Sequence, residues 1–554
     1  MPLSQAARLF HTVRYLRGGQ ILSRIRHRFS SPRVVPTRSA SARKWPQPWP
    51  LHALLGPGLV GPGTFEFLGE RARIGKAADW NDPVRSHLWL YNLHYLSDLN
   101  AAGAQGREDE LRDLVQRWIR DNPPGQGVGW EPYPLSLRIV NLVKWLARQH
   151  AIEPEWLASL ATQADALSRR IEFYLLGNHL FANAKALVFA GAFLAGDRAP
   201  RWLERGLAIL ARQVPEQFLP DGGHFERSPM YHAALLADLF DLIELADVSA
   251  LPVLRARREA WVDAANRGLN WLDAMTHPDG EIAFFNDAAI GIAPNPIVLA
   301  RHAARLLGAR TPPARPPFDL RLLRESGYVR VDLPAAGAAL LDIAPLGPDY
   351  LPAHGHADTL SFELSLFGTR VFVNSGTSMY GASEERLRQR GTAAHNTVLI
   401  DNENSSEVWG GFRVARRARA TLHGAEPGPK RIVIHGSHDG YRRLPGRNTH
   451  WRRWTFGLDS LQVDDTVTGR FRSAEARYHL HPAVVVQQLD PQARRAVLRL
   501  PGGQSVVLDA TGASLQAEPA TWHPRFGVSV ANRCLVLRFE GGQVGTRLQW
   551  QDAA

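Results

Sequence analysis

The spacing of apolar residues divides the chain into two long regions. From about residue 84 to 308, segments such as LSLRIVNLVKWLARQH, NHLFANAKALVFAGAFLAG and YHAALLADLFDLIELAD repeat apolar residues at i, i+3, i+4 and i+7, which is the period of an amphipathic helix. Beyond about residue 318, short β-branched runs such as LSFELSLFG, RVFVNSG and WRRWTFGL alternate between turn-forming residues, which is typical of β-strands. The pattern predicts a helical domain followed by a β domain.

Composition predicts the remaining boundaries. We expect a basic segment over residues 1–48, an irregular strap over 49–83, an α/α toroid over 84–310, a stiff proline-rich linker over 311–317 and a β-sandwich over 318–554. The helices show no repeat period of the kind that solenoids have, which favours a toroid with a cleft at one end. The predicted fold class is multidomain α+β, with an N-terminal α/α toroid (an incomplete barrel) followed by an antiparallel β-sandwich.

The net charge of +12 is concentrated near the start of the chain. Residues 1–48 hold nine Arg and one Lys, so 55 of the 65 basic residues remain elsewhere, against 53 acidic ones. This near-neutral body argues against a nucleic-acid partner. Apolar residues are mixed with the arginines over residues 1–30, which leaves two interpretations open: a helix on an anionic membrane face, or a helix docked on its own domain.

The same segment bears on location. Arg8, Arg14 and Arg17 interrupt the apolar run that a signal peptide needs, and no stretch approaches the ~20 apolar residues of a membrane span. We therefore expect a cytoplasmic protein, with peripheral membrane contact through residues 1–30, and keep a periplasmic location as the alternative. The sequence leaves the oligomeric state open.

Four clusters of polar and aromatic residues are candidates for chemistry: GNHLFANAKAL at 177–187, DGGHFERSPMYHAALL at 221–236, LGPDYLPAHGHADTLSFELSLFG at 346–368, and VFVNSGTSMYG with RLRQRGTAAHNTVLID at 371–401. Each alone has an ordinary structural interpretation. Asn178 is a good helix N-cap, Tyr231 a half-buried aromatic residue, and the arginines of the fourth cluster solvated surface residues.

Taken in order, the clusters resemble the heparinase II/III family of lyases. The resemblance covers roughly residues 80–490, and HGHAD with AAHNTV is its strongest part. LWLYNLHYLSDL, GWEPYPLSLRIVNLVKW, SHDGYRRL and YHLHP also look like family members from polysaccharide-associated gene clusters. The resemblance implies an α/α toroid followed by antiparallel β-sheets. It further implies a lyase acting on a uronate-containing acidic polysaccharide, linked to exopolysaccharide or surface-polysaccharide metabolism.

The resemblance also implies roles for single residues. Asn178 or His179 would neutralise the uronate carboxylate, Tyr231 would be the catalytic tyrosine and His354 the catalytic histidine. His356 and His395 resemble zinc-ligating positions, and Asn374 stands where an Asp usually completes the set, although Asn is a poorer zinc ligand. The chemistry itself needs no cofactor, so a zinc ion would be structural. We expect the substrate to contact Asn183, His224, Glu226, Arg227, Tyr380, Arg388, Arg390 and Asn396.

These residue types suit β-elimination. The C5 proton of a uronate is too weakly acidic while the neighbouring carboxylate is ionised, so a donor or cation must first offset that charge. A base then takes the proton and an acid protonates the leaving C4 oxygen. Tyr231 alone would serve both steps in a syn elimination, whereas His354 would be the base and Tyr231 the acid in an anti elimination. The sequence leaves both open.

Two other functions remain. A glycoside hydrolase on the same fold would need two facing carboxyl groups, for which Glu226 with Asp287, or Asp221 with Glu281, are the candidates. A polysaccharide-binding or assembly protein that has lost activity would keep the fold without the chemistry. The sugar, its linkage and endo versus exo action are not indicated.

Overall fold

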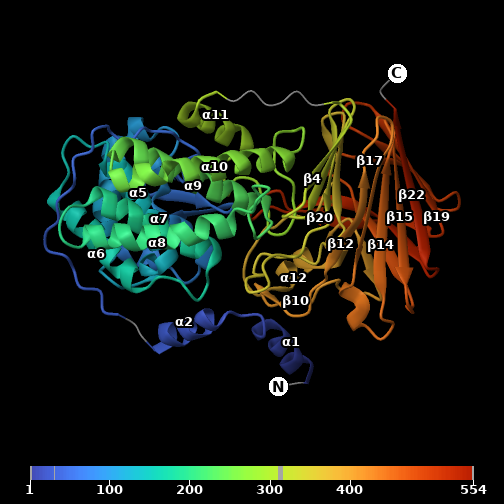
Figure 1. Ribbon diagram of the computed structural model, residues 1–554, viewed down its shortest axis with the longest axis horizontal. Coiled ribbons are helices and arrows are strands. Elements are labelled where there is room, and N and C mark those ends of the chain that lie inside the picture. Colours follow the sequence, from blue (N-terminus) through green and yellow to red (C-terminus); the bar gives the residue numbers. More distant parts are fainter. Residues whose placement is uncertain (1–2, 30–31, 310–315, 552–554) are drawn as a thin grey trace.

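The computed structural model describes residues 3–29, 32–309 and 316–551. A helical body and a β body lie side by side, as Figure 1 shows. This is the predicted order of an α/α toroid followed by an antiparallel β-sandwich, and the predicted fold class is confirmed. The predicted proline-rich linker at 311–317 lies, apart from its last two residues, outside the described residues.

The N-terminal segment forms two helices, α1 (Leu3–Val13) and α2 (Gly18–Phe29), that run beneath both bodies (Figure 1). Arg17 forms an ion pair of 2.7 Å with Glu216 of the helical domain, and Gln20 Nε2 donates to the carbonyl of Tyr350 at 3.2 Å. The interpretation of a helix docked on its own domain therefore holds. None of the described helices is both long and apolar enough to cross a membrane.

The following segment is more ordered than predicted. Within the expected irregular strap at 49–83, the chain forms a three-stranded antiparallel sheet of β1 (Leu59–Gly61), β2 (Thr64–Phe67) and β3 (Glu70–Arg73). Phe65 is buried and the ring of Phe67 packs edge-on against Trp89 at 5.5 Å. The prediction of irregular structure was wrong here. The alternate aromatic residues Phe65 and Phe67 make one face of the sheet apolar, and that face is buried against the helical domain.

The helical domain is built around one central helix. Helix α7 is rich in Ala, Leu, Phe and Gly, and all of its residues except His179 are buried, as expected of a largely apolar helix at the centre of a domain. It packs against α5, α6, α8 and α9. The domain comprises α3 (His87–Tyr95), α4 (Glu108–Asp121), α5 (Pro132–Leu146), α6 (Pro154–Arg169), α7 (Gly177–Phe193), α8 (Ala199–Gln217), α9 (Pro229–Ser249), α10 (Pro252–Ala274) and α11 (Pro296–Leu307).

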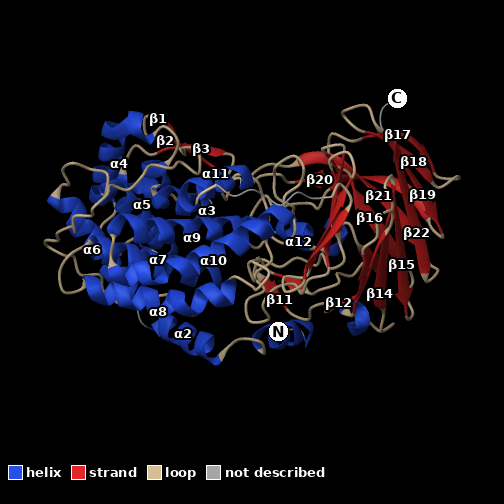
Figure 2. Cartoon of the chain, turned by 45° about the horizontal axis from the view of Figure 1, so that its top comes forward, coloured by secondary structure: helices blue, strands red, loops and turns tan. Residues whose placement is uncertain are grey.

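The β domain packs smaller sheets against one large one (Figure 2). The five-stranded sheet runs in the order β4 (Asp319–Leu323), β5 (Tyr328–Leu333), β6 (Gly337–Asp342), β7 (Phe362–Leu366), β8 (Thr369–Phe372). The four-stranded sheet runs β20 (Ser514–Trp522), β21 (Val530–Phe539), β16 (Ala474–His479), β9 (Val398–Ile400). The large sheet runs β12 (Ala420–Glu426), β13 (Ile432–His438), β14 (Thr449–Phe456), β15 (Ser460–Thr468), β22 (Gln543–Gln551), β19 (Ser505–Thr511), β18 (Arg495–Arg499), β17 (Val485–Asp490).

All these pairings are antiparallel, and apolar side chains from the facing sheets share one core. Phe362 of β7, for example, meets Trp454 of β14 edge-on with ring centres 6.5 Å apart. A short hairpin of β10 (Val408–Trp409) and β11 (Arg413–Val414) and the helix α12 (Glu384–Arg390) lie at the edge that faces the helical domain (Figure 1).

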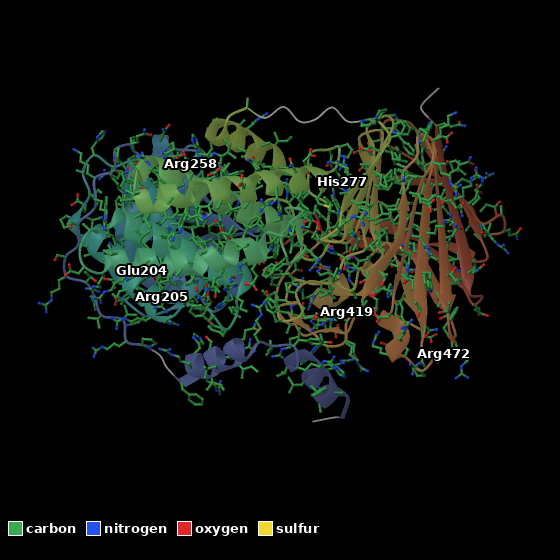
Figure 3. The ribbon with its side chains drawn as sticks, viewed as in Figure 1. Glu204, Arg205, Arg258, His277, Arg419 and Arg472 are labelled. Atoms are coloured by element: carbon green, nitrogen blue, oxygen red, sulfur yellow. The ribbon has the colours of Figure 1, made fainter. Side chains whose placement is uncertain are left out.

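Buried contacts fix the two domains against each other. Trp271 and Met275 at the end of α10 form a small apolar core with Tyr328 and Leu340 of the β domain. Beside it, His277 lies where the two bodies meet (Figure 3) and bonds to the fully buried Glu363 at 2.9 Å. The candidate site therefore lies at a rigid junction between the two domains.

Candidate active site

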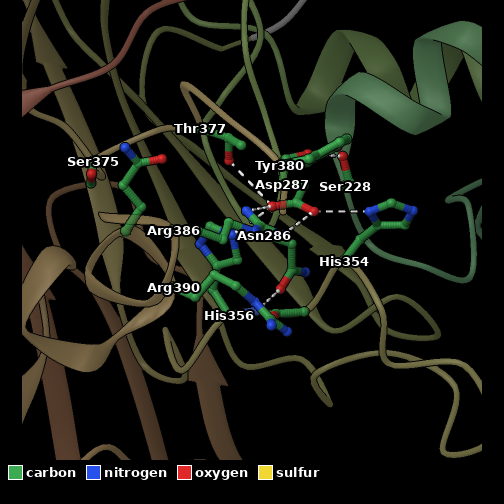
Figure 4. Close-up of polar contacts among 12 residues, drawn as sticks. Ser228, Asn286, Asp287, His354, His356, Ser375, Thr377, Tyr380, Arg386 and Arg390 are labelled. Carbon is green, nitrogen blue, oxygen red and sulfur yellow. Dashed lines mark hydrogen bonds and ion pairs between the residues drawn. The ribbon is translucent and has the colours of Figure 1, made fainter. Parts of the chain in front are cut away.

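A single buried carboxylate organises the junction. Asp287 follows α10 in a fully buried segment and accepts hydrogen bonds from His354 Nδ1 at 2.8 Å, His356 Nε2 at 2.9 Å and Thr377 Oγ1 at 3.3 Å (Figure 4). Both terminal nitrogens of Arg386 also bind it, one of them at 2.7 Å. Burial alone would raise the pKa of Asp287, but the Arg386 guanidinium and the two imidazoles hold it well below its usual range. Asp287 is thus a permanent anion.

The predicted meeting of Tyr231 and His354 is confirmed. Tyr231 lies in the first turn of α9, and its ring packs on that of His354 with centres 4.0 Å apart. Because a carboxylate only accepts hydrogen bonds, Asp287 holds the proton of His354 on Nδ1 and leaves Nε2 with its lone pair. The Tyr231 hydroxyl lies 2.9 Å from that of Tyr380, and burial together with Tyr380 raises the pKa of Tyr231 well above its ordinary value.

Glu226 joins this pair to the start of α7. It is buried, one carboxyl oxygen accepts from the backbone N–H of Asn178 at 3.4 Å, and the other lies 3.6 Å from His354 Nε2. Burial raises the pKa of Glu226. Gly177, the residue before Asn178, is closely packed here: a Cβ at this position would lie 2.5 Å from Leu351 and 2.7 Å from Glu226.

Asn178 does not cap α7, because the helix already begins at Gly177. Its amide instead donates to the hydroxyl of Tyr133 at 3.5 Å. His179 stacks on the same Tyr133 ring with centres 4.2 Å apart, and its Nδ1 bonds to Glu172 at 3.2 Å. Burial lowers the pKa of His179, but the Glu172 carboxylate outweighs this and raises it. The raised pKa favours the cationic form of His179, whose side chain is 27% exposed at the surface of the site.

Aromatic residues from both domains surround these groups. Tyr133 packs against Tyr91 and Tyr95 of α3, while Tyr380 of the β domain packs against Phe412. Sequence reasoning missed Tyr133 and Glu172 as site residues. The signals were available, since Tyr133 lies within GWEPYPL and Glu172 six residues before Asn178.

Residues 79–296 match the family model for the heparinase II/III N-terminus, and residues 315–551 match that for the heparinase II/III-like C-terminal region. The chain belongs to the heparinase II/III-like family.

Named relatives and solved structures agree with this. The chain is 24% identical over 417 residues to a heparin-sulfate lyase of Bacteroides thetaiotaomicron, covering 67% of this chain but only 57% of that protein. It is 26% identical over 482 residues to FtsZ-localized protein C of Caulobacter vibrioides, covering 80% and 77% of the two chains. A crystal structure of heparinase III has a TM-score of 0.68 at 18% identity, covering 88% of this chain and 80% of that one, and shows the shared fold.

Within this heparinase II/III-like site, three residues predicted to contact substrate are instead buried and bonded to other residues of the protein. Asn183 bonds to Ser136 and Glu172, His224 to Gln217, and Arg227 to the carbonyls of Phe225 and Ser326, and all three are buried. The prediction placed them correctly near the site but wrongly at its surface. Asn183 holds Glu172 in place, which gives it a positioning role.

The fourth cluster divides in the same way. Arg390 is buried and donates to the carbonyl of Gly355 at 2.7 Å, and the buried Asn396 donates to the carbonyl of Phe362 at 2.8 Å, so neither is free to contact a glycan. Arg388 is 44% exposed and pairs with Glu385 at 2.6 Å. It borders a hollow of about 360 Å³ at the edge of the β domain. Of the predicted contacts, Glu226, Tyr380 and Arg388 stay predictions.

The predicted zinc ligands do not form a suitable donor set. His356 Nδ1 and His395 Nε2 lie 3.3 Å apart, but Asn374 already accepts from the Asn396 N–H at 3.3 Å and donates to Ser361 at 3.4 Å. A structural zinc site needs four strong ligands, and these residues supply two imidazoles and an occupied carboxamide. We therefore derive no chemical step from zinc.

Three of the four carboxyl groups proposed for a hydrolase are engaged in contacts inside the protein. Asp287 receives five hydrogen bonds and is fully buried, so it has no lone pair for substrate. Asp221 bonds to the backbone of Gly223 and to Ser326, and Glu281 accepts from Asn295. These contacts hold loops in place and disfavour the hydrolase alternative.

Proposed function

We propose that this heparinase II/III-like protein is a polysaccharide lyase that cleaves a uronate-containing acidic polysaccharide by β-elimination. The observation that carries the proposal is the stacked pair of Tyr231 and His354, from different domains, with the His354 tautomer set by Asp287. The names of the Bacteroides thetaiotaomicron and Pedobacter heparinus relatives, both heparin-sulfate lyases, support the same class of substrate.

The first step is neutralisation of the uronate carboxylate. The raised pKa of His179 favours its cationic form, and the raised pKa of Glu226 favours a carboxyl group that donates a hydrogen bond. Both lie beside Asn178 at the start of α7. A cation and neutral donors around one carboxylate make the neighbouring C5 proton more acidic, because they stabilise the negative charge that develops on its removal.

The imidazole of His354 and the hydroxyl of Tyr231 carry out the two proton transfers. His354 Nε2 takes the C5 proton, the C–H electron pair forms the C4–C5 double bond, and the C4–O bond breaks. The Tyr231 hydroxyl then gives its proton to the departing C4 oxygen. The high pKa of Tyr231 keeps that proton in place until the oxygen becomes basic, and Asp287 stabilises the imidazolium formed on His354, as a buried carboxylate does in a catalytic triad.

A panel of acidic polysaccharides, read by the ultraviolet absorbance of unsaturated uronate products, tests the proposal. We expect cleavage of at least one member, no measurable product from Tyr231→Phe, and normal cleavage by the control Tyr15→Phe, whose ring lies outside the site. Full activity in Tyr231→Phe would end the assignment. New reducing ends without the absorbance would indicate hydrolysis.

The second candidate is a polysaccharide-binding or assembly protein without catalysis. We keep it because the chain also matches, over 80% of its length, FtsZ-localized protein C, whose name states a location and no lyase activity. Such a protein would retain an acidic glycan in a binding assay and release no unsaturated product from any member of the panel. The two candidates therefore separate in one experiment.

We also propose that α1 and α2 contact an anionic membrane surface at its cytoplasmic face. Their polar side docks on the protein, while their apolar side chains face outward: Leu9, Phe10, Val13, Ile21, Leu22, Ile25 and Phe29 are 41–82% exposed. No acidic residue precedes Glu66, so the surface suits anionic lipid. We expect co-sedimentation with phosphatidylglycerol vesicles, loss of it in Leu22→Glu/Phe29→Glu, and little with phosphatidylcholine. Equal binding by the variant, or recovery only in a periplasmic fraction, would contradict the proposal.

A further inference from the structure

Outside the cleft, three metal-ligating side chains converge where the strap crosses the helical domain. His52 lies on the strap, Glu244 on α9 and His302 on α11. The Nε2 atoms of His52 and His302 each lie 3.9 Å from a different oxygen of Glu244, and the three ligand atoms fall within 4.8 Å of one another. Glu244 follows Tyr231 by 13 residues on the same helix, roughly 20 Å along its axis, so this cluster is separate from the catalytic pair.

The carboxylate at the centre of the cluster lacks ordinary partners. Glu244 is 8% exposed and receives no hydrogen bond from any residue in the described part of the chain, while the two imidazoles lie 3.9 Å from its oxygens. A buried carboxylate without hydrogen bonds is costly. Each imidazole directs its Nε2 atom towards a different oxygen of this carboxylate.

We propose that His52, Glu244 and His302 bind a divalent transition-metal ion of the Zn²⁺ type, with water as the fourth ligand. Two imidazoles and one carboxylate are a common donor set for zinc, whereas Mg²⁺ and Ca²⁺ prefer oxygen ligands alone. Tetrahedral ligands at ~2.0–2.1 Å from zinc lie about 3.4 Å from one another. The three ligand atoms lie within 4.8 Å of one another, so the site has to close by at most about 1.4 Å when the ion enters. His52, with 22% of its side chain exposed, gives the ion a route from solvent.

Arg305 competes with the ion. Its guanidinium lies 2.7 Å from His52 Nδ1 and 3.3 Å from His302 Nδ1, and both nitrogens must accept its protons. An imidazole that binds a metal through Nε2 carries its own proton on Nδ1 and no longer accepts one there. Arg305 is exposed on α11, so its side chain can turn to solvent when the ion enters. The site therefore binds metal reversibly, and its affinity depends on this arginine.

Binding would fasten three segments that are distant in the sequence. The ion would join the strap at residue 52 to α9 and α11, which already pack against each other. An added cross-link of this kind stabilises the folded state by mass action, because the unfolded chain does not bring the three ligands together. The proposed role is a metal-dependent staple that holds the strap on the helical domain, and it does not depend on the lyase proposal.

Calorimetric titration of metal-free protein with Zn²⁺, and the visible spectrum with Co²⁺, test the site. We expect one tight equivalent in the wild type, at least tenfold weaker binding in His302→Asn and in Glu244→Gln, and unchanged binding in the control His150→Asn, which alters an exposed histidine. His52→Asn changes only the partly exposed strap and provides a variant that keeps the helical core. Arg305→Gln should bind Zn²⁺ at least threefold more tightly, because the side-chain oxygen of glutamine can accept the Nδ1–H of a metal-bound histidine.

Three results would overturn the proposal. The first is a wild-type protein that binds no Zn²⁺ at micromolar concentrations. The second is a stoichiometry and affinity that stay unchanged in all three ligand variants. The third is loss of the tight equivalent in His395→Asn with retention in His302→Asn, which would place the ion in the β domain. A rise in Tm with Zn²⁺ in the wild type, absent from His52→Asn, is the expected stability readout.

Discussion

Two histidine–carboxylate pairs lie in the candidate site at the domain junction, and they differ in what surrounds the carboxylate. Glu172 of the helical domain bonds to His179 and Asn183, and no arginine is among its hydrogen-bond partners in the described residues. Asp287, between the domains, is neutralised by Arg386 as well as by two imidazoles. The first carboxylate therefore favours the protonated form of its histidine, while the second holds the proton of His354 on Nδ1. The same kind of pair thus favours a cation at His179 and, in our proposal, a base at His354.

The largest effect should come from removing the charge of Asp287. In Asp287→Asn the buried Arg386 loses its counter-ion, and breaking a buried pair in this way costs about 3–5 kcal/mol. We also expect cleavage to fall by roughly 10³-fold, because His354 loses the acceptor that sets its tautomer. Chemical denaturation and product absorbance measure the two effects. Thr377→Val, which removes only the 3.3 Å bond to the same carboxylate, is the control. Wild-type stability in Asp287→Asn would refute the role of the Asp287 carboxylate as the counter-ion of Arg386.

A comparison of His354 with His356 sharpens the assignment of the base. Both bond to Asp287, but only His354 stacks on Tyr231. We expect His354→Gln to lower kcat by roughly 10²–10⁴-fold and His356→Gln, matched in chemistry, to lower it by less than tenfold once unfolded protein is corrected for. Circular dichroism and kinetics on soluble fractions measure this. Equal losses in the two variants would remove the distinction between base and positioning residue.

The His179–Glu172 pair predicts a pH dependence. Glu172 raises the pKa of His179 above its ordinary 6.5, so the interaction stabilises the protein fully below that value and is lost as the pH rises through the raised pKa. We expect KM to increase along the same alkaline limb, as the cation for the uronate is lost. Glu172→Gln should move that limb to lower pH, whereas Glu155→Gln, on the outer surface of α6, should not. A limb that stays in place in Glu172→Gln would show that another group titrates.

The smallest effect is expected from chelation. The donor set around His356, His395 and Asn374 does not suit zinc, so dialysis against a chelator should change kcat by less than about twofold relative to mock-dialysed protein, as expected of a reaction without metal-ion catalysis. Assays of the same samples before and after readdition of Zn²⁺ measure it. A loss of kcat that Zn²⁺ restores, with the protein still folded, would show that a metal ion takes part in catalysis.

How far the sequence could predict this site is clearest in α12. The spacing of Arg386, Arg388 and Arg390 allowed three surface cations, but the segment is a helix, so residues 386 and 390 share the buried face and residue 388 lies opposite. Nothing local indicates which face is buried. The same holds for Asp287, whose partners come from 67, 69 and 99 residues away, a separation that no periodic pattern records.

By itself the sequence determined the helical and β halves, because burial of one face imposes a period on each element. Its ordered motifs also led to the prediction of Tyr231 and His354 as a catalytic pair, because chemistry requires particular side chains, and the structure brings their rings into contact. Only the tertiary structure decided which polar residues reach the cleft and which hold it in place. The physical reason is that the protonation and exposure of a group depend on neighbours that are brought together by packing of the two domains, and these neighbours are far apart along the chain.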